Sequence, residues 1–66
     1  MIDFGKCLIK AQTVKAISSA ELARTIGVHR QQINIWRNKK NVRLDTLIKV
    51  CNALDMPVEL FLFNEI

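Results

Sequence analysis

Hydrophobic residues recur along most of the chain at the three- and four-residue spacing that is typical of amphipathic helices. Residues 3–17 place Phe4, Leu8 and Ala11 on one face and lysines outside it. The most regular pattern lies in residues 44–54, where the positions expected to face inward are Leu44, Leu47, Ile48, Cys51 and Leu54. The pattern therefore predicts a first and a last helix that pack with one apolar face each.

A helix-start signal precedes a short second helix over residues 19–26. The Ser18 hydroxyl can accept a hydrogen bond from the amide of Glu21 while the Glu21 carboxylate reaches back, which forms a capping box. Gly27 ends this helix, because glycine adopts the left-handed conformation without steric cost. The side chains expected to face inward are Leu22, Ala23 and Ile26.

A third helix is expected over residues 30–38, with Val28 packed at its start and with Ile33 and Trp36 facing the core. Residues 39–43 form a polar, basic connection, and Asp55, Met56 and Pro57 end the last helix. The tail, residues 58–66, is β-branched and aromatic enough for a strand, although one and a half helical turns also fit. The composition of the tail favours the strand.

The central region is strongly basic. Six basic residues lie between positions 24 and 43, and no acid occurs between Glu21 and Asp45. A face that is basic only for solubility would mix both signs of charge. Together with the net charge of +4, this distribution favours a polyanion as the partner.

Length and composition exclude several classes of protein. A chain of 66 residues forms one small domain, with no second domain to sense a small molecule. Cys7 and Cys51 lie in apolar stretches and, with one histidine, do not make a zinc site. We expect no metal, cofactor, membrane span or signal peptide, and a cytoplasmic location with two buried thiols. The scattered acids and the lack of a phosphate-binding glycine loop argue against an enzyme.

The spacing of Ala23, Gly27, Ile33 and Trp36 joins these short helices into a more specific pattern. Ala23 lets two helices cross closely, Gly27 makes the turn, and Ile33 with Trp36 anchors the following helix. At this point the sequence resembles the Cro/C1 (XRE-type) helix-turn-helix family. Residues 18–23 match its cap and second helix, residues 27–33 its turn and recognition helix, and residues 44–54 its fourth helix.

The resemblance covers nearly the whole chain and implies an all-α, lambda-repressor-like bundle of four helices. On this basis we expect a DNA-binding domain over residues 1–57 and a dimerisation segment over residues 58–66. It also implies a transcriptional regulator that reads double-stranded DNA with the helix over residues 30–38.

Helical geometry turns Gln31, Asn34 and Ile35 away from the core-facing side of the third helix, and Arg30 lies near its N-terminus. Arg30 can bind guanine O6 and N7, Gln31 can pair with adenine N6 and N7, and Ile35 can cover a thymine methyl. A singly exposed isoleucine is also common in proteins without any such role. In the family, the positions of Arg30, Gln31 and Ile35 usually read bases. The predicted base contacts are Arg30, Gln31, Asn34 and Ile35.

Phosphate contacts are expected on both sides of the third helix. The second helix presents free amides at its N-terminus, and the loop after the third helix is polar and basic. Any one of these side chains could serve only solubility, but the group as a whole favours the DNA backbone. The predicted phosphate contacts are Ser19, His29, Gln32, Arg37, Asn38, Lys39, Lys40 and Arg43.

The chain departs from the family pattern at three places. Ser19 replaces a glutamine that often contacts a phosphate, so that bridge is expected to be lost or mediated by water. Gln12 and Arg37 replace an arginine and an acid that pair in many members, and Arg37 is therefore expected to be free for the DNA backbone. The apolar run over residues 58–63 replaces the usual acidic fifth helix.

The apolar tail suggests a dimer. One helix-turn-helix covers half of a site, and so small a core cannot bury every apolar side chain of the tail. The tail could instead only cap the core of the monomer. The predicted dimer interface contains Val58, Leu60, Phe61, Leu62 and Phe63. The leading hypothesis is a Cro/C1-like repressor or autoregulator on an inverted-repeat operator. The alternative is an antitoxin that binds a toxin and regulates its own operon.

Overall fold

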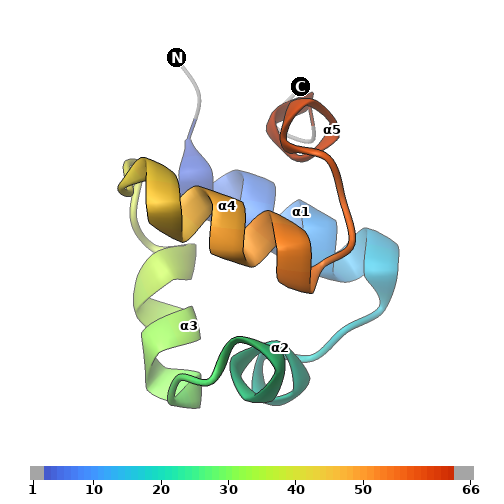
Figure 1. Ribbon diagram of the computed structural model, residues 1–66. Helices are drawn as coiled ribbons and strands as arrows, with labels where there is room; N and C mark the ends of the chain where they lie inside the picture. Colours follow the sequence, from blue (N-terminus) through green and yellow to red (C-terminus); the bar gives the residue numbers. More distant parts are fainter. Residues whose placement is uncertain (1–2, 64–66) are drawn as a thin grey trace.

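The computed structural model describes residues 3–63, which form five helices and, within that range, no strand (Figure 1). The helices are α1 (Phe4–Lys15), α2 (Ser19–Ile26), α3 (Arg30–Arg37), α4 (Leu44–Ala53) and α5 (Val58–Phe63). The predicted all-α class is confirmed, as are the positions of the first four helices to within two residues. Residues 64–66 of the predicted dimerisation segment lie outside the described residues.

α1 begins at Asp3, whose side chain accepts a hydrogen bond from the amide of Lys6 at 3.1 Å. It ends at Ala16, which adopts a left-handed conformation with φ of 53° and donates to the carbonyls of Gln12 and Thr13. Phe4, Leu8 and Ala11 are all buried, as their spacing predicted. Cys7 is buried on the same face, so the first helix contributes much of the core.

α2 has the start and the stop that the sequence predicted. Ser18 Oγ accepts from the amide of Glu21 at 3.1 Å, and Glu21 Oε1 accepts from the amide of Ser18 at 3.4 Å. Gly27, with φ of 91°, ends the helix and donates to the carbonyl of Ala23 at 2.8 Å. Leu22 and Ala23 are buried and Ile26 packs against the same core.

α4 buries a face that is rotated from the predicted one. Cys51 and Leu54 are buried as expected, and Val50, which was not predicted to face inward, is completely buried. Leu44 and Ile48 are instead 69% and 43% exposed. The inward residues are Leu47, Val50, Cys51 and Leu54, which keep the helical spacing, because α4 packs against both α2 and α5.

The prediction of a strand in the tail is wrong, because residues 58–63 form α5. Among residues 3–63 there is no other strand to supply partners for an extended backbone, whereas a helix pairs its own amides and carbonyls. The side chains agree with the helical period: Val58, Phe61 and Leu62 turn inward, while Leu60 and Phe63 remain exposed. The tail of this chain is thus a fifth helix, although an apolar one.

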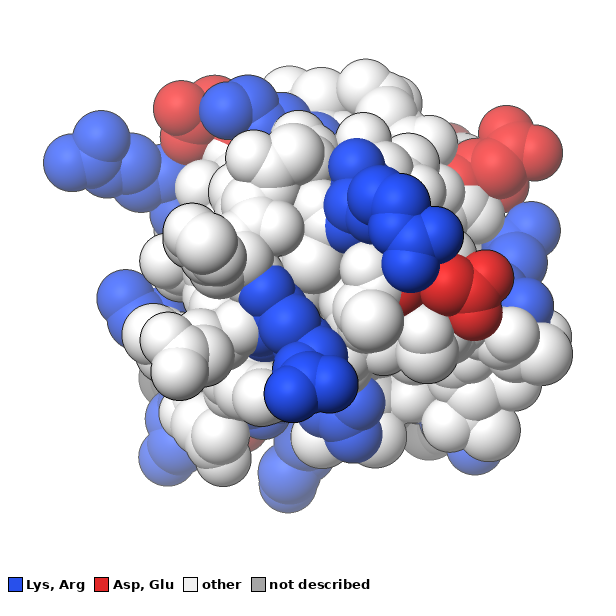
Figure 2. Space-filling model, turned by 90° about the horizontal axis from the view of Figure 1, so that it is seen from below, with Lys and Arg blue, Asp and Glu red and all other residues white. Residues whose placement is uncertain are grey.

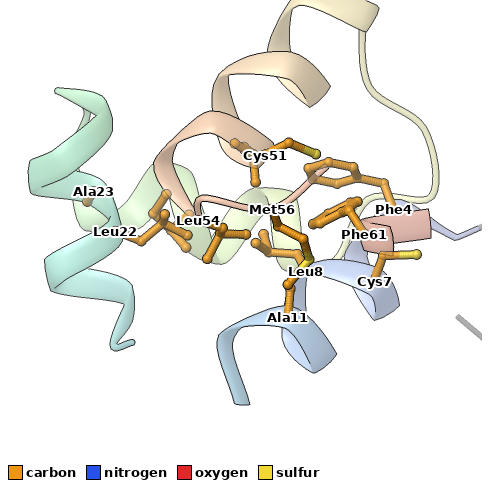
Figure 3. Close-up of a cluster of buried hydrophobic side chains, with 12 residues drawn as sticks. Phe4, Cys7, Leu8, Ala11, Leu22, Ala23, Cys51, Leu54, Met56 and Phe61 are labelled. Carbon is orange, nitrogen blue, oxygen red and sulfur yellow. The ribbon is translucent and has the colours of Figure 1, made fainter. Parts of the chain in front are cut away.

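The core joins α5 to α1 rather than leaving the tail outside. Phe61 is completely buried, and its ring lies 5.5 Å from that of Phe4 between centroids (Figure 3). The Cys7 thiol lies 3.8 Å from the carbonyl oxygen of Leu62, to which it donates a hydrogen bond. Cys51 is also buried, and burial raises the pKa of its thiol. The expectation of two buried thiols is confirmed.

Gly5 permits a close approach between α1 and the loop after α3. The amides of Phe4 and Gly5 donate to the carbonyls of Lys40 and Lys39 at 2.9 and 2.7 Å. A Cβ atom at position 5 would lie only 2.3 Å from the carbonyl oxygen of Arg37. The open amides at the start of α1 thereby fix the backbone of the basic loop.

Candidate nucleic-acid interface

The outward face of α3 carries the four side chains that were predicted to read bases. Arg30, Gln31, Asn34 and Ile35 are all exposed, and Ile35 keeps half of its surface open at 50%. Ile33 is completely buried and Trp36 packs partly against the core. α3 is therefore fixed by one face and presents the other to solvent, as helical geometry predicted.

A shallow hollow lies at the start of α3 and includes a residue that the sequence did not single out for binding. It is lined by Val28, His29, Gln31, Gln32 and Ile35. Val28 was expected only to pack at the start of the helix, and it is indeed partly buried. Val28 and Ile35 both line the hollow, so two apolar side chains lie beside the polar side chains of His29, Gln31 and Gln32. Such a surface can hold the methyl group of a thymine between hydrogen-bonding groups.

The predicted phosphate contacts surround α3 on two sides. Lys39, Lys40 and Arg43 are exposed in the loop that α1 holds by its amides. His29 is exposed at the start of α3, where its side chain makes no capping hydrogen bond, and Gln32 is half-buried one turn later. The Asn38 side chain donates to the carbonyl of Asn34 at 2.9 Å and so closes the end of α3.

Arg37 has hydrogen-bond partners within the protomer, although the sequence predicted a side chain without any; its contact with a DNA phosphate stays a prediction. Its Nη1 atom donates to Gln12 Oε1 at 3.1 Å and to Ser19 Oγ at 3.3 Å. An arginine does not need a carboxylate as its partner, because a glutamine amide also offers an acceptor to a guanidinium. Arg37 is half-buried at the junction of α1, α2 and α3.

The electrostatic character of this side of the molecule is positive. Figure 2 views the molecule from below, from the side of α2, and shows Lys and Arg side chains spread over a mostly uncharged surface, with Asp and Glu side chains at fewer places. The acid that borders the region in α2, Glu21, is hydrogen-bonded within the capping box. A surface of this kind attracts a phosphate backbone through Coulomb forces at short range.

A comparison with protein families decides what this arrangement is. A model of the Cro/C1-type helix-turn-helix DNA-binding domain matches residues 13–61, which is more than half of the chain. The chain belongs to this family. It is therefore a DNA-binding transcriptional regulator, and the helix-turn-helix of the family lies in the matched region that contains α2 and α3.

This Cro/C1-type protein is similar in structure to the restriction-modification controller protein C.AhdI from Aeromonas hydrophila. The two chains are 30% identical, the TM-score is 0.74, and the match covers 91% of this chain and 92% of the other. A search of curated protein sequences gave no significant match. The likeness in fold therefore extends over nearly the whole of both chains.

The predicted dimer residues of this regulator differ in exposure. Phe61 is completely buried inside the protomer, so its assignment to the interface is wrong. Leu60 and Phe63 are 50% and 65% exposed, and Val58 and Leu62 are half-buried. Four of the five predicted residues thus remain at least partly accessible to another protein.

No group of three or more His, Cys, Asp or Glu side chains within residues 3–63 is placed to hold a metal ion. None of the described helices combines the length and the apolar character needed to cross a bilayer.

Two residues that hold parts of this surface in place were not among the predicted site residues. Gln12 is buried beneath Arg37, and its signal was a polar residue on the inward face of an amphipathic helix. Gly5 holds the basic loop, and its signal was a glycine inside a helical pattern.

Proposed function

We propose that this regulator binds an inverted-repeat operator as a homodimer and represses transcription there, including that of its own gene. The observation that carries the proposal is the outward face of α3, where Arg30, Gln31, Asn34 and Ile35 are exposed together beside a basic loop. A recognition helix needs such a face, because each base pair presents donors, acceptors or a methyl group in the major groove.

Arg30 and Gln31 lie in the first turn of α3, the part of a recognition helix that approaches base edges. A guanidinium can form two hydrogen bonds with guanine, and a glutamine amide can form two with adenine. Ile35 and Val28 line one hollow and would prefer a thymine methyl. Each good pairing is worth about 1–3 kcal/mol of discrimination against the wrong base.

The backbone contacts would come from His29, Gln32, Asn38 and the loop residues Lys39, Lys40 and Arg43, with Ser19 and Arg37 at the junction with α2. These groups flank the base-reading face, so they can fix the register of α3 in the groove without reading sequence. The hydrogen bonds from Phe4 and Gly5 hold the loop backbone in place before DNA arrives.

The size of the protomer supports the dimer. Its longest dimension is 28 Å, whereas successive major grooves on one side of B-DNA are about 34 Å apart. One protomer therefore reads one half-site, and two are needed for a complete operator. Leu60 and Phe63 on α5 supply exposed apolar surface for pairing, with Val58 and Leu62 at its edge. Such a contact about a two-fold axis would match the symmetry of an inverted repeat.

The dimer is tested by sedimentation of the wild-type protein and of Leu60→Glu and Phe63→Glu. We expect a dimer for the wild type and monomers for the variants, because a buried unpaired carboxylate is unfavourable. The matched control is Val14→Glu, which adds the same charge at another exposed apolar position. A wild-type protein that stays monomeric would favour the antitoxin alternative, in which the same surface binds a different protein.

The structural likeness to a restriction-modification controller favours a more specific role. At 30% identity over 91% of the chain, this regulator would control genes of a restriction-modification system. The test is whether expression of a neighbouring nuclease or methyltransferase gene changes when the regulator is deleted. Unchanged expression would exclude control of a restriction-modification system but would not contradict the more general role as a transcriptional regulator.

DNA binding is tested by titration against the DNA just upstream of its own gene, at several salt concentrations, with random duplex as the competitor. Specific binding is expected, and no preference over random DNA would contradict the proposal. Arg30→Ala should relax the choice of sequence, whereas Lys40→Ala should mainly flatten the dependence on salt. If the two variants behaved alike, the division between base and phosphate contacts would be wrong.

A further inference from the structure

Gln12 is a buried polar side chain that connects three helices. It is only 5% exposed, and its Oε1 atom accepts a hydrogen bond from Arg37 Nη1 at 3.1 Å. Its Nε2 atom donates to the carbonyl of Ile17 and to Ser19 Oγ, both at 3.3 Å. Because the amide both donates and accepts, it fixes the end of α3 to α1 and to the start of α2.

The partners of Arg37 position it without neutralising its charge. Both acceptors of its Nη1 atom, Gln12 Oε1 and Ser19 Oγ, belong to uncharged groups. Within residues 3–63 no carboxylate forms an ion pair with it, and the Glu21 carboxylate nearby is hydrogen-bonded to Ser18. A guanidinium has five N–H donors, so Arg37 keeps donors for a further acceptor.

The cluster is open to solvent on one side. A hollow of about 380 Å³ at the start of α2 is lined by Gln12, Ser19 and Arg37, and also by Glu21, whose carboxylate is hydrogen-bonded to Ser18. An anion that enters it can reach the guanidinium and the hydroxyl together. On the proposed docking of α3 in the major groove, the start of α2 faces the DNA backbone.

We propose that Gln12 is a positioning residue whose neutrality leaves Arg37 as an uncompensated cation for one DNA phosphate. The inference rests on the proposed DNA-binding function. It assigns to Gln12 an effect on affinity without contact to DNA: the amide orients the guanidinium, and the phosphate supplies the missing negative charge. Ser19 completes the site as a second donor to that phosphate.

Two substitutions at position 12 separate charge from shape. Gln12→Glu places a carboxylate beside Arg37, and Gln12→Met keeps a similar length without charge or hydrogen bonds. The probe is a short duplex that the wild-type protein enriches from a randomised pool. Each phosphate contact contributes about 0.9 to the slope of log affinity against log salt concentration. We expect Gln12→Glu to reduce the magnitude of the slope by about 0.9 for each protomer, and Gln12→Met to leave the slope unchanged.

Two controls complete the experiment. Asn52→Glu makes the same change of net charge at an exposed position of α4 and should barely alter the slope. In an Arg37→Met background, whose slope should already be shallower by about 0.9 for each protomer, Gln12→Glu should have no further effect beyond that of Asn52→Glu. Thermal unfolding followed by circular dichroism identifies the variants that remain folded.

A wild-type slope in folded Gln12→Glu would overturn the inference, as would a wild-type slope in Arg37→Met if the position 12 variants did not fold. An equal loss of slope in Gln12→Met and Gln12→Glu would also overturn it, because charge would then not matter. Failure of the proposed function is a different result: the wild-type protein would enrich no sequence and show no dependence on salt.

Discussion

α2 and α3 are both eight residues long, yet different interactions hold them in place. α2 carries its own start and stop, in the capping box at Ser18 and the left-handed turn at Gly27. α3 begins at His29, whose side chain makes no capping hydrogen bond, and only one of its residues, Ile33, is fully buried. α2 is thus encoded locally, whereas α3 depends on contacts with its neighbours.

The difference follows from what each helix is used for. A recognition helix must present polar side chains outward, and a position that faces outward cannot contribute a buried side chain to the core. α3 compensates through groups outside itself: Arg37 reaches Gln12 and Ser19, and the loop that follows is bound by the amides of Phe4 and Gly5. Substitutions that remove the anchors of α3 should therefore have larger effects than those that remove the caps of α2.

The largest effect is expected at the one fully buried residue of α3. Ile33→Ala should lower the free energy of unfolding by about 2–5 kcal/mol, from lost burial and the cavity left behind. A domain of this length is stable by roughly 3–10 kcal/mol in total, at about 0.05–0.15 kcal/mol per residue. Urea unfolding followed by circular dichroism measures the change, and much of the protein should unfold in low urea.

Ile35→Ala is the matched control, since it makes the same truncation two residues away on the exposed face. Its free energy of unfolding should stay within about 0.5 kcal/mol of wild type. Its DNA binding should instead lose preference for one thymine. Equal destabilisation by the two substitutions would contradict the division of α3 into an anchored face and a reading face.

A smaller loss is expected where α1 holds the loop after α3. Gly5→Ala would place a Cβ atom 2.3 Å from the carbonyl oxygen of Arg37, so the backbones must separate. We expect a loss of about 1–3 kcal/mol, which outweighs the usual gain from alanine in a helix. Thermal unfolding measures it. Gly27→Ala is the comparison: no atom blocks its Cβ, and only the φ of 91° opposes it. A loss of about 1 kcal/mol is expected there.

The two N-caps give the next smaller difference. Ser18→Ala removes a hydrogen bond to the amide of Glu21 and should cost about 1 kcal/mol. His29→Ala removes no capping hydrogen bond and should change the free energy of unfolding by no more than a few tenths of that. Chemical denaturation of both variants provides the comparison. A large loss in His29→Ala would show that α3 has a local start after all.

The same contrast explains which parts of the structure could be predicted from the sequence. The capping box, Gly27 and the polar face of α3 are local patterns, and all three were predicted. The predicted inward face of α4 was rotated about the helix axis from the observed one, so that Leu44 and Ile48 are exposed. Their exposure depends on how α2 and α5 pack against α4. Periodicity alone gives a face only to within part of a turn.

Errors arose where tertiary contacts overrule local preference. The β-branched and aromatic tail folds as α5 because Phe61 packs on Phe4 and no described strand could pair with it. Arg37 was expected to be free because only charge was considered, whereas the acceptor it uses is an amide from a distant part of the chain. The exposure of the candidate base contacts was easier to predict, since an exposed helix face follows from the positions of its buried residues.

The last expected effect is a gain in stability, and it tests whether α3 lacks anything that a local signal could supply. Position 29 is the N-cap of α3, and Gln32 lies at its third helical position. His29→Ser would therefore complete the pattern of a serine followed three residues later by a glutamine, which is a capping box. We expect the free energy of unfolding to rise by about 0.5–1 kcal/mol in urea titrations. His29→Ala, which provides no acceptor, is the control. If both variants gain stability, the gain comes from the removal of histidine and not from a new cap. If neither variant gains stability, Ile33 and the contacts of Arg37 already hold α3 fully formed.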